Sequence, residues 1–99
     1  MTLKINDYEY NITSFTYRIA AFDDDNNTKK FQKILNCNII GPIDIDEVGE
    51  EIVNNFNGNI IINSENEFYQ FYNFNFDTIS LAVDENKNYD IIFIKSMNS

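Results

Sequence analysis

The sequence contains no histidine and no tryptophan, and it has one cysteine, one proline and three glycines in 99 residues. The absence of histidine removes the commonest general base and the commonest protein ligand for metals. The single cysteine, Cys37, excludes an internal disulfide and a zinc site built from several thiolates. Since no histidine can deprotonate Cys37, a cysteine nucleophile is also disfavoured. These absences predict a protein that is not an enzyme and that uses no cofactor and no metal.

Long apolar runs are missing as well. One of the longest, Ile91 to Ile94, is far shorter than the roughly 20 residues that a membrane span requires. The N-terminal residues 1–5 lack the charged stretch and apolar run of a signal peptide. We therefore expect a cytoplasmic protein with no membrane partner.

Positive charge is scarce. Seven Lys and Arg oppose 16 Asp and Glu, which gives a net charge of −9. Asparagine (17 residues) and isoleucine (16 residues) are abundant, as in an AT-rich coding sequence, and the same codon bias should enrich lysine, yet only six lysines occur. We interpret this shortage as selection against positive surface charge, although acidity that serves solubility alone explains it equally well.

The apolar pattern predicts an α+β fold in a single compact domain over residues 1–99, with a mainly antiparallel sheet of about six strands. A hairpin at the start of the chain turns at Asn6-Asp7. The apolar positions change parity near Thr13-Ser14, which indicates a bulge or bend. Segments 28–40 and 65–72 fit either a strand or a helix, and we favour strands for both.

The clearest predicted element is one principal amphipathic helix over about 44–57, packed on one face of the sheet. Asp44 is a suitable N-cap, and the apolar residues that follow recur with helical spacing. Gly58 stands where a helix commonly ends. Gly49 costs about 1 kcal/mol relative to alanine inside a helix, which indicates that another backbone comes close to it.

Acidic side chains gather on this helix and in one loop. Glu47, Glu50 and Glu51 have i, i+3 and i+4 spacing, and no lysine follows at i+4 to pair with them. A solvated helix face explains this pattern, and the alternative is a surface for a basic partner. The candidate partner-binding acids are Asp23, Asp24, Asp25, Asp44, Asp46, Glu47, Glu50 and Glu51. Such a surface repels phosphates, so it would not bind nucleic acid directly, but it could imitate nucleic acid in a basic groove.

Aromatic residues make up 15% of the chain and are concentrated at residues 68–76, which read FYQFYNFNF. As a strand, this segment would place aromatic rings on both faces of the sheet. Internal packing accounts for such rings, and the alternative is that Tyr69 and Phe71 contact a partner.

Two classes of function fit these observations. The first is a small acidic inhibitor that occupies the basic surface of a nucleic-acid-handling protein, as phages and mobile elements use against bacterial defence. An immunity protein that neutralises a basic toxin is a variant of this class, and a homodimer is compatible with both. The second class is a structural subunit of a phage particle or another homo-oligomeric assembly. Size, absent catalytic groups and charge support the first class, whereas no specific motif does.

Overall fold

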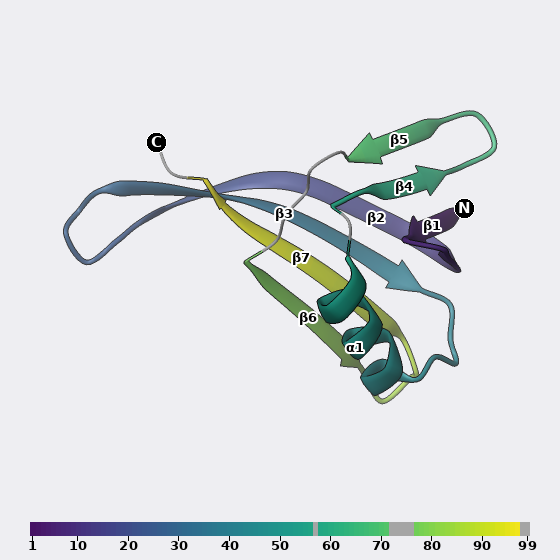
Figure 1. Ribbon diagram of the computed structural model, residues 1–99. Coiled ribbons are helices and arrows are strands. Elements are labelled where there is room, and N and C mark those ends of the chain that lie inside the picture. Colours follow the sequence, from purple (N-terminus) through teal and green to yellow (C-terminus); the bar gives the residue numbers. More distant parts are fainter. Residues whose placement is uncertain (57, 72–76, 98–99) are drawn as a thin grey trace.

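The computed structural model describes residues 1–56, 58–71 and 77–97, with the side chains of Gln70 and Phe71 excepted. Within these residues the chain forms an antiparallel sheet and one helix (Figure 1). The elements in chain order are β1 (Thr2–Ile5), β2 (Tyr8–Asp23), β3 (Lys29–Ile39), α1 (Ile45–Asn55), β4 (Ile60–Asn63), β5 (Phe68–Phe71), β6 (Thr78–Val83) and β7 (Tyr89–Met97). The strand order in the sheet is β5-β4-β1-β2-β3-β7-β6.

The prediction of a mainly antiparallel sheet with a helix is confirmed, but the sheet has seven strands rather than about six. Segment 28–40, which the sequence left open, forms β3, and the described part of segment 65–72 contains β5. Strands β4 and β5 have four residues each. Elements this short show no clear periodicity, so their pairing defines them better than their pattern does.

The β1–β2 hairpin turns as expected. Ile5 pairs with Tyr8, which leaves Asn6 and Asp7 as the two turn residues. Asn6 has a φ of 55°, a left-handed conformation that asparagine tolerates in such turns. The register of β2 against β3 then shifts between Ile12 and Ser14, which confirms the predicted bulge.

The core is one cluster of buried apolar side chains from the strands and from α1. Its fully buried side chains include Leu3 and Ile5 from β1, Ile60 from β4 and Phe93 from β7. The helix contributes Val48 and Ile52 to the same cluster. Just after the helix, the Phe56 ring stacks on Phe93 with the ring centroids 6.0 Å apart. Burial of these apolar surfaces is the main stabilising contribution to the fold.

The helix begins at its predicted cap and ends earlier than predicted. The carboxylate of Asp44 accepts hydrogen bonds from the backbone amides of Asp46 and Glu47, at 3.1 and 3.2 Å. The helix ends at Asn55 rather than near 57, because Phe56 adopts an extended conformation. The expectation for Gly49 was wrong. The nearest atom to a Cβ there is the Leu81 side chain at 3.5 Å, not another backbone.

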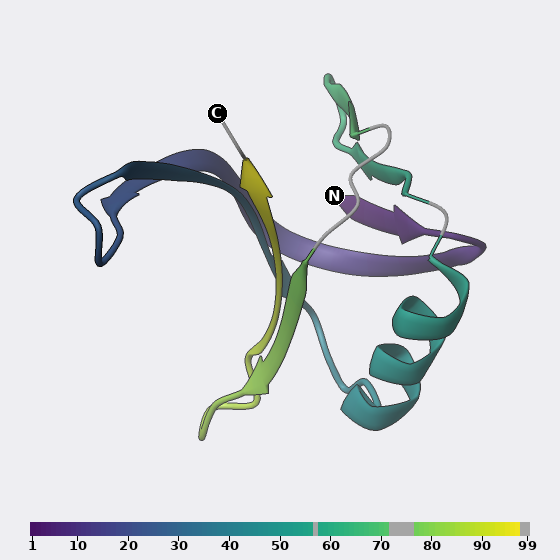
Figure 2. The ribbon, with the colours of Figure 1, turned by 60° about the vertical axis from the view of Figure 1, so that its left-hand side comes forward.

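Strands β2 and β3 continue beyond the rest of the sheet as a long hairpin, which we call the arm and define as residues 17–33. Figures 1 and 2 show the arm projecting from the sheet, away from α1. None of the buried core side chains belongs to it. The arm and the rest of the molecule therefore differ in how much of their apolar surface is covered.

Candidate protein-binding site

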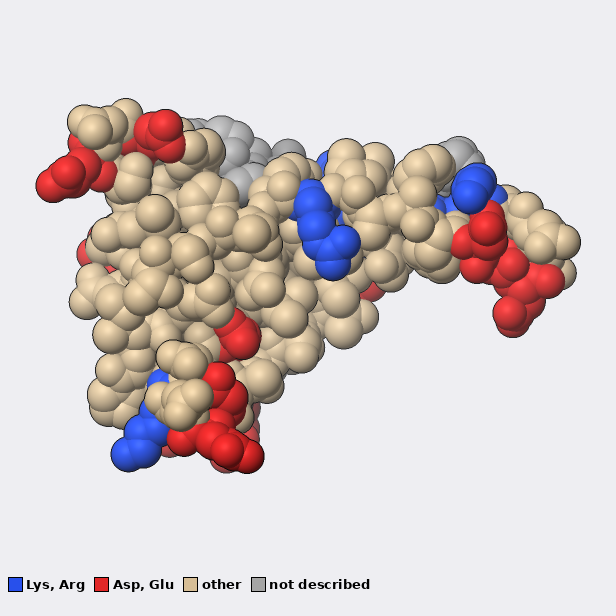
Figure 3. All heavy atoms as spheres, turned by 180° about the vertical axis from the view of Figure 1, so that it is seen from behind, with Lys and Arg blue, Asp and Glu red and all other residues tan. Residues whose placement is uncertain are grey.

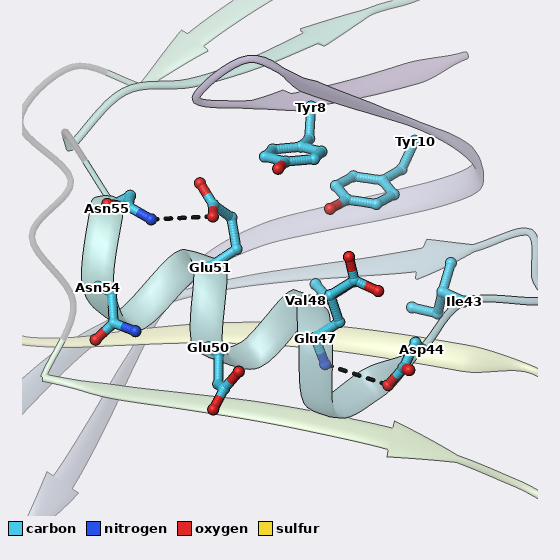
Figure 4. A pocket seen from close by; sticks show the side chains of 10 residues that line it. All are labelled: Tyr8, Tyr10, Ile43, Asp44, Glu47, Val48, Glu50, Glu51, Asn54 and Asn55. Carbon is cyan, nitrogen blue, oxygen red and sulfur yellow. Dashed lines mark hydrogen bonds between the residues drawn. The ribbon is translucent and has the colours of Figure 1, made fainter.

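A groove of about 380 Å³ lies between α1 and the β1–β2 hairpin (Figure 4). We call it the tyrosine–glutamate groove. Its lining residues are Tyr8, Tyr10, Ile43, Asp44, Glu47, Val48, Glu50, Glu51, Asn54 and Asn55. None of these residues carries a positive charge at neutral pH.

Strand β2 supplies the aromatic wall of the groove. Tyr8 pairs with Ile5 and Tyr10 pairs with Leu3, so both rings project on the core face of the sheet. Tyr8 is 48% exposed, and Tyr10 is half-buried against the core. Burial is the main cause that raises the pKa of Tyr10, and the neighbouring Tyr8, Glu51 and Glu47 raise it further. The Tyr10 phenol is therefore neutral at physiological pH and can donate a hydrogen bond.

The helix supplies the acidic wall. In Figure 4 the side chains of Glu47 and Glu51 point toward the two tyrosine rings, whereas Glu50 points away, toward β6. The Glu51 carboxylate accepts a hydrogen bond of 2.9 Å from the Asn55 side-chain amide, which fixes its direction. Asp44 caps the helix and borders the same groove.

The structure separates the other predicted acids from this groove. Asp46 lines a different hollow, between α1 and Leu81 of β6. The Asp23–Asp25 loop lies at the tip of the arm, far from α1 in both ribbon views (Figures 1 and 2). Of the eight predicted acids, Asp44, Glu47 and Glu51 border the groove, and Glu50 borders both the groove and the hollow that Asp46 lines. One partner surface that includes all eight would have to span most of the molecule.

Two of the three carboxylates of the arm tip, those of Asp23 and Asp24, already have partners. Asp24 accepts hydrogen bonds from the backbone amides of Asn26 and Thr28, both at 2.9 Å, and these bonds lower its pKa. Asp23 forms an ion pair with Lys29 at 2.9 Å. These interactions hold the turn and reduce the net negative charge that it offers to a partner.

The two predicted aromatic contacts, Tyr69 and Phe71, belong to β5, the edge strand next to β4. The Tyr69 ring packs edge-to-face against Phe15, with the ring centroids 5.0 Å apart. Its hydroxyl donates a hydrogen bond to the Glu67 carboxylate, which raises the pKa of Tyr69. Tyr69 is thus part of the internal packing, and its contact with a partner stays a prediction. Phe71 pairs with Ile60 through its backbone, and its side chain lies outside the described residues.

Sequence reasoning missed the aromatic wall. In the sequence, Tyr8 and Tyr10 alternate with polar residues, which predicts a strand and does not indicate a binding site. The signal that could have found the site is the two-residue turn, which fixes both tyrosines opposite Ile5 and Leu3 and thus on the core face of the sheet. No local sequence pattern shows which residues of α1 lie opposite Tyr8 and Tyr10.

Charge is unevenly distributed along the chain. The arm holds four basic residues and three acidic ones, a net charge of +1, and the remaining three basic and 13 acidic residues give −10. Figure 3 views the molecule from behind. Acidic side chains appear mainly toward its ends, and the surface between them is mostly uncharged and carries a basic side chain near its middle. The acids of the groove therefore belong to a strongly negative part of the molecule.

No helix within the described ranges is long and apolar enough to cross a membrane. In the same residues, no group of three or more His, Cys, Asp or Glu side chains is arranged to hold a metal ion. Comparisons with protein families, with curated proteins and with solved structures found no significant match to this chain.

Proposed function

We propose that this chain is a non-enzymatic binding protein whose tyrosine–glutamate groove receives a basic segment of a partner protein. The observation that carries the proposal is the pairing of two tyrosine rings with two glutamates across a groove that no cation lines. The proposal takes α1 as packed on one face of the sheet, because that arrangement brings the two walls together.

The chemistry of the groove suits arginine or lysine. Glu47 and Glu51 can accept charge-assisted hydrogen bonds, which are about twice as strong as neutral ones. The faces of Tyr8 and Tyr10 attract a cation held near them by about 0.5–2 kcal/mol. A guanidinium group satisfies both walls at once because it is planar, charged and able to stack.

The dimensions of the groove favour a segment over a folded domain. Its volume of about 380 Å³ is near the lower end of the range for ligand cavities. A loop or tail can insert one or two long side chains there, while the surrounding acids attract the rest of a basic surface. Attraction of this kind accelerates association and weakens as salt is added.

A nucleic-acid-handling protein is the partner class we propose. Such proteins carry arginine and lysine surfaces that neutralise phosphates. The part of this chain outside the arm carries a net charge of −10 and can occupy such a surface in place of nucleic acid. This supports an inhibitor of the anti-defence type, acting in the cytoplasm, with the immunity protein as a variant. Direct binding of nucleic acid is disfavoured by the same charge.

The experiment compares capture of a partner from cells of the native source by three immobilised double variants. Glu47→Gln/Glu51→Gln removes two charges from the groove. Glu65→Gln/Glu85→Gln and Asp23→Asn/Asp25→Asn each remove two charges elsewhere, so all three variants have a net charge of −7 instead of −9. Capture is repeated at low and high salt, and the affinity for the identified partner is then measured by calorimetry.

We expect the groove variant to lose about tenfold or more in affinity, because two desolvated charge pairs are lost. The other two variants should lose less than about threefold, as exposed charges do. An equal loss in all three would show that net charge alone determines binding. Unchanged affinity of the groove variant would show that its acids are a solvated helix face.

The alternative function, a structural subunit of a homo-oligomer, is favoured by one specific observation. The outer edge of β2 in the arm has no described strand beside it. Light scattering separates the alternatives, because a subunit of this kind forms a ring or filament and an inhibitor forms a monomer or dimer.

A further inference from the structure

We infer that the outer edge of β2, from Phe15 to Asp23, is a self-pairing edge. On it a second copy of this chain adds its own β2 in antiparallel orientation, which joins two sheets into one. This inference does not rest on the tyrosine–glutamate groove, because the edge lies on the arm and the groove lies beneath the β1–β2 hairpin. It develops the observation on the β2 edge that favours a homo-oligomer.

The edge is long, and beyond Asn11 no strand among the described residues pairs with it. Strand β2 has 16 residues, and β1 pairs only with its first four, Tyr8 to Asn11. Beyond that point, β3 is the only strand among the described residues that pairs with β2. Strands with open edges are templates for pairing with another chain, and natural proteins usually protect them with charges or prolines. Residues 13–22 contain one charged residue, Arg18, and no proline.

The hydrogen bonds of the turn fix which backbone groups point outward. The amide of Asp24 donates to the Thr28 carbonyl at 3.0 Å, so these two residues form a hydrogen-bonded pair. In the same register, Phe22 pairs with Lys30 and Ala20 with Gln32. Because such pairs recur every second residue in antiparallel strands, the even-numbered residues of β2 bond to β3. The amides and carbonyls of the odd-numbered residues from Phe15 to Asp23 therefore point away from β3.

One antiparallel register pairs the whole stretch from Phe15 to Asp23 with the same stretch of the second copy. With Ile19 on a two-fold axis, Ile19 faces Ile19 of the second copy and Ala21 faces Tyr17 of the second copy. All odd-numbered residues from Phe15 to Asp23 then face an odd-numbered residue, as hydrogen-bonded antiparallel pairs require. An axis at Ala21 would place Ile19 against Asp23 of the second copy. An axis at Tyr17 would leave Asp23 beyond the end of the pairing.

Charge and exposure identify the occupant as a second copy. Ile19 is 58% exposed and Phe22 is 43% exposed, although both are large apolar side chains. Two copies with a net charge of −9 repel each other over most of their surface, but the only acid between Phe15 and Asp23 is Asp23 itself, which forms an ion pair with Lys29 at 2.9 Å. This stretch therefore allows two copies to approach with little repulsion, and their apolar side chains lose contact with water on pairing.

Cysteine cross-linking tests the register. In Ile19→Cys the two Cα atoms would be about 5.5 Å apart, which is within the range of a disulfide. In the control Phe22→Cys they would be six residues apart along the strands, roughly 20 Å, which is too far. The native Cys37 is buried and takes no part in the reaction. Mild oxidation should cross-link Ile19→Cys and not Phe22→Cys, and equal cross-linking of both would overturn the register.

Light scattering over a range of concentrations tests the association itself. We expect a dimer with about twice the 11.6 kDa mass of the chain, and a monomer for Ile19→Lys, which places two like charges on the axis. The matched control, Val83→Lys, makes the same type of change on the exposed edge strand β6 and should remain a dimer. A native chain that stays monomeric at millimolar concentration would overturn the inference, and this edge would then be open to an extended segment of another protein. Glu47→Gln/Glu51→Gln should dimerise normally, which keeps this test separate from that of the groove.

Discussion

The arm and the rest of the chain, which we call the body, contain strands with the same alternation of apolar and polar residues but differ in their surroundings. In the body one set of the alternating residues forms the core, and Ile12, Leu35 and Phe93 are buried. In the arm the same face carries Ile19 and Phe31, which are exposed. The two regions also differ in charge, with −10 in the body and +1 in the arm. The comparison shows that alternation determines which face is apolar, whereas the neighbouring elements determine whether that face is buried or exposed.

Truncation of a large side chain should show the widest difference between the two regions. Phe93→Ala removes a fully buried ring that stacks on Phe56, and we expect a loss of about 3–5 kcal/mol in the free energy of unfolding. Ile19→Ala in the arm should cost less than about 0.5 kcal/mol in the monomer, because its side chain already contacts water. Urea denaturation of both variants at low concentration measures the difference. Similar losses would show that the arm is packed as tightly as the body.

Loss of the Asp44 N-cap should destabilise α1 and leave the stability of the arm unchanged. Asp44→Ala removes an acceptor for two backbone amides, and we expect a cost of about 1 kcal/mol. Amide hydrogen exchange should become faster in α1 and remain the same in β2 residues of the arm. Asp44→Asn is the control, since asparagine caps helices about as well. Faster exchange in the arm of Asp44→Ala would mean that the two regions unfold together.

A substitution that favours the helical conformation of α1 should stabilise the body. Gly49→Ala replaces a poor helix former, and the Leu81 side chain at 3.5 Å leaves room for the new methyl group. We expect a gain of about 0.5–1 kcal/mol in the free energy of unfolding, measured by thermal denaturation. A loss of stability would show that the helix has to move away from β6 to accommodate the methyl group.

Two turns provide the smallest effect, and here the arm and the body should behave alike. Asp24 in the arm and Asp84 in the body each accept hydrogen bonds from the backbone amides two and four residues later. These bonds lower the pKa of both carboxyls. Because the folded pKa lies below the unfolded one, the stability they contribute is present above about pH 4 and is lost as the pH falls through the folded pKa.

Asp24→Asn and Asp84→Asn should therefore flatten the acid end of the curve of stability against pH by similar small amounts. Both carboxylates are exposed to solvent, which keeps each contribution small. Chemical denaturation between pH 2 and pH 6 measures these changes. A large effect of Asp84→Asn alone would show that the turn of the body is coupled to its core.

Much of the fold could be predicted from local patterns. The turn at Asn6-Asp7, the bulge near Thr13-Ser14 and the Asp44 cap all depend on a few neighbouring residues, and the structure contains each of them. The length of β2 could not be predicted, since its alternation continues through Asp23 whether or not another strand lies beside it. The strand order also depends on pairings between distant segments, which single-sequence periodicity does not encode.

The candidate site was predicted only in part for the same reason. The acids of α1 share one element, so the spacing of Glu47 and Glu51 placed them together. The tyrosines opposite them belong to β2, and only the tertiary packing of α1 against the hairpin brings Tyr8 and Tyr10 to the same groove. Only their charge links the acids at the arm tip to those of α1, and the length of the arm separates the two groups in space.

The most direct test of the proposed binding site is an NMR titration of the ¹⁵N-labelled chain with an arginine-rich peptide of about ten residues. We predict salt-sensitive shift changes at the backbone amides of Tyr8, Tyr10, Glu47 and Glu51, with the amide of Asp25 at the arm tip unchanged. An acidic peptide of the same length is the control and should cause no change. Shift changes at the arm tip without changes in the groove would contradict the proposal that the groove binds a basic segment.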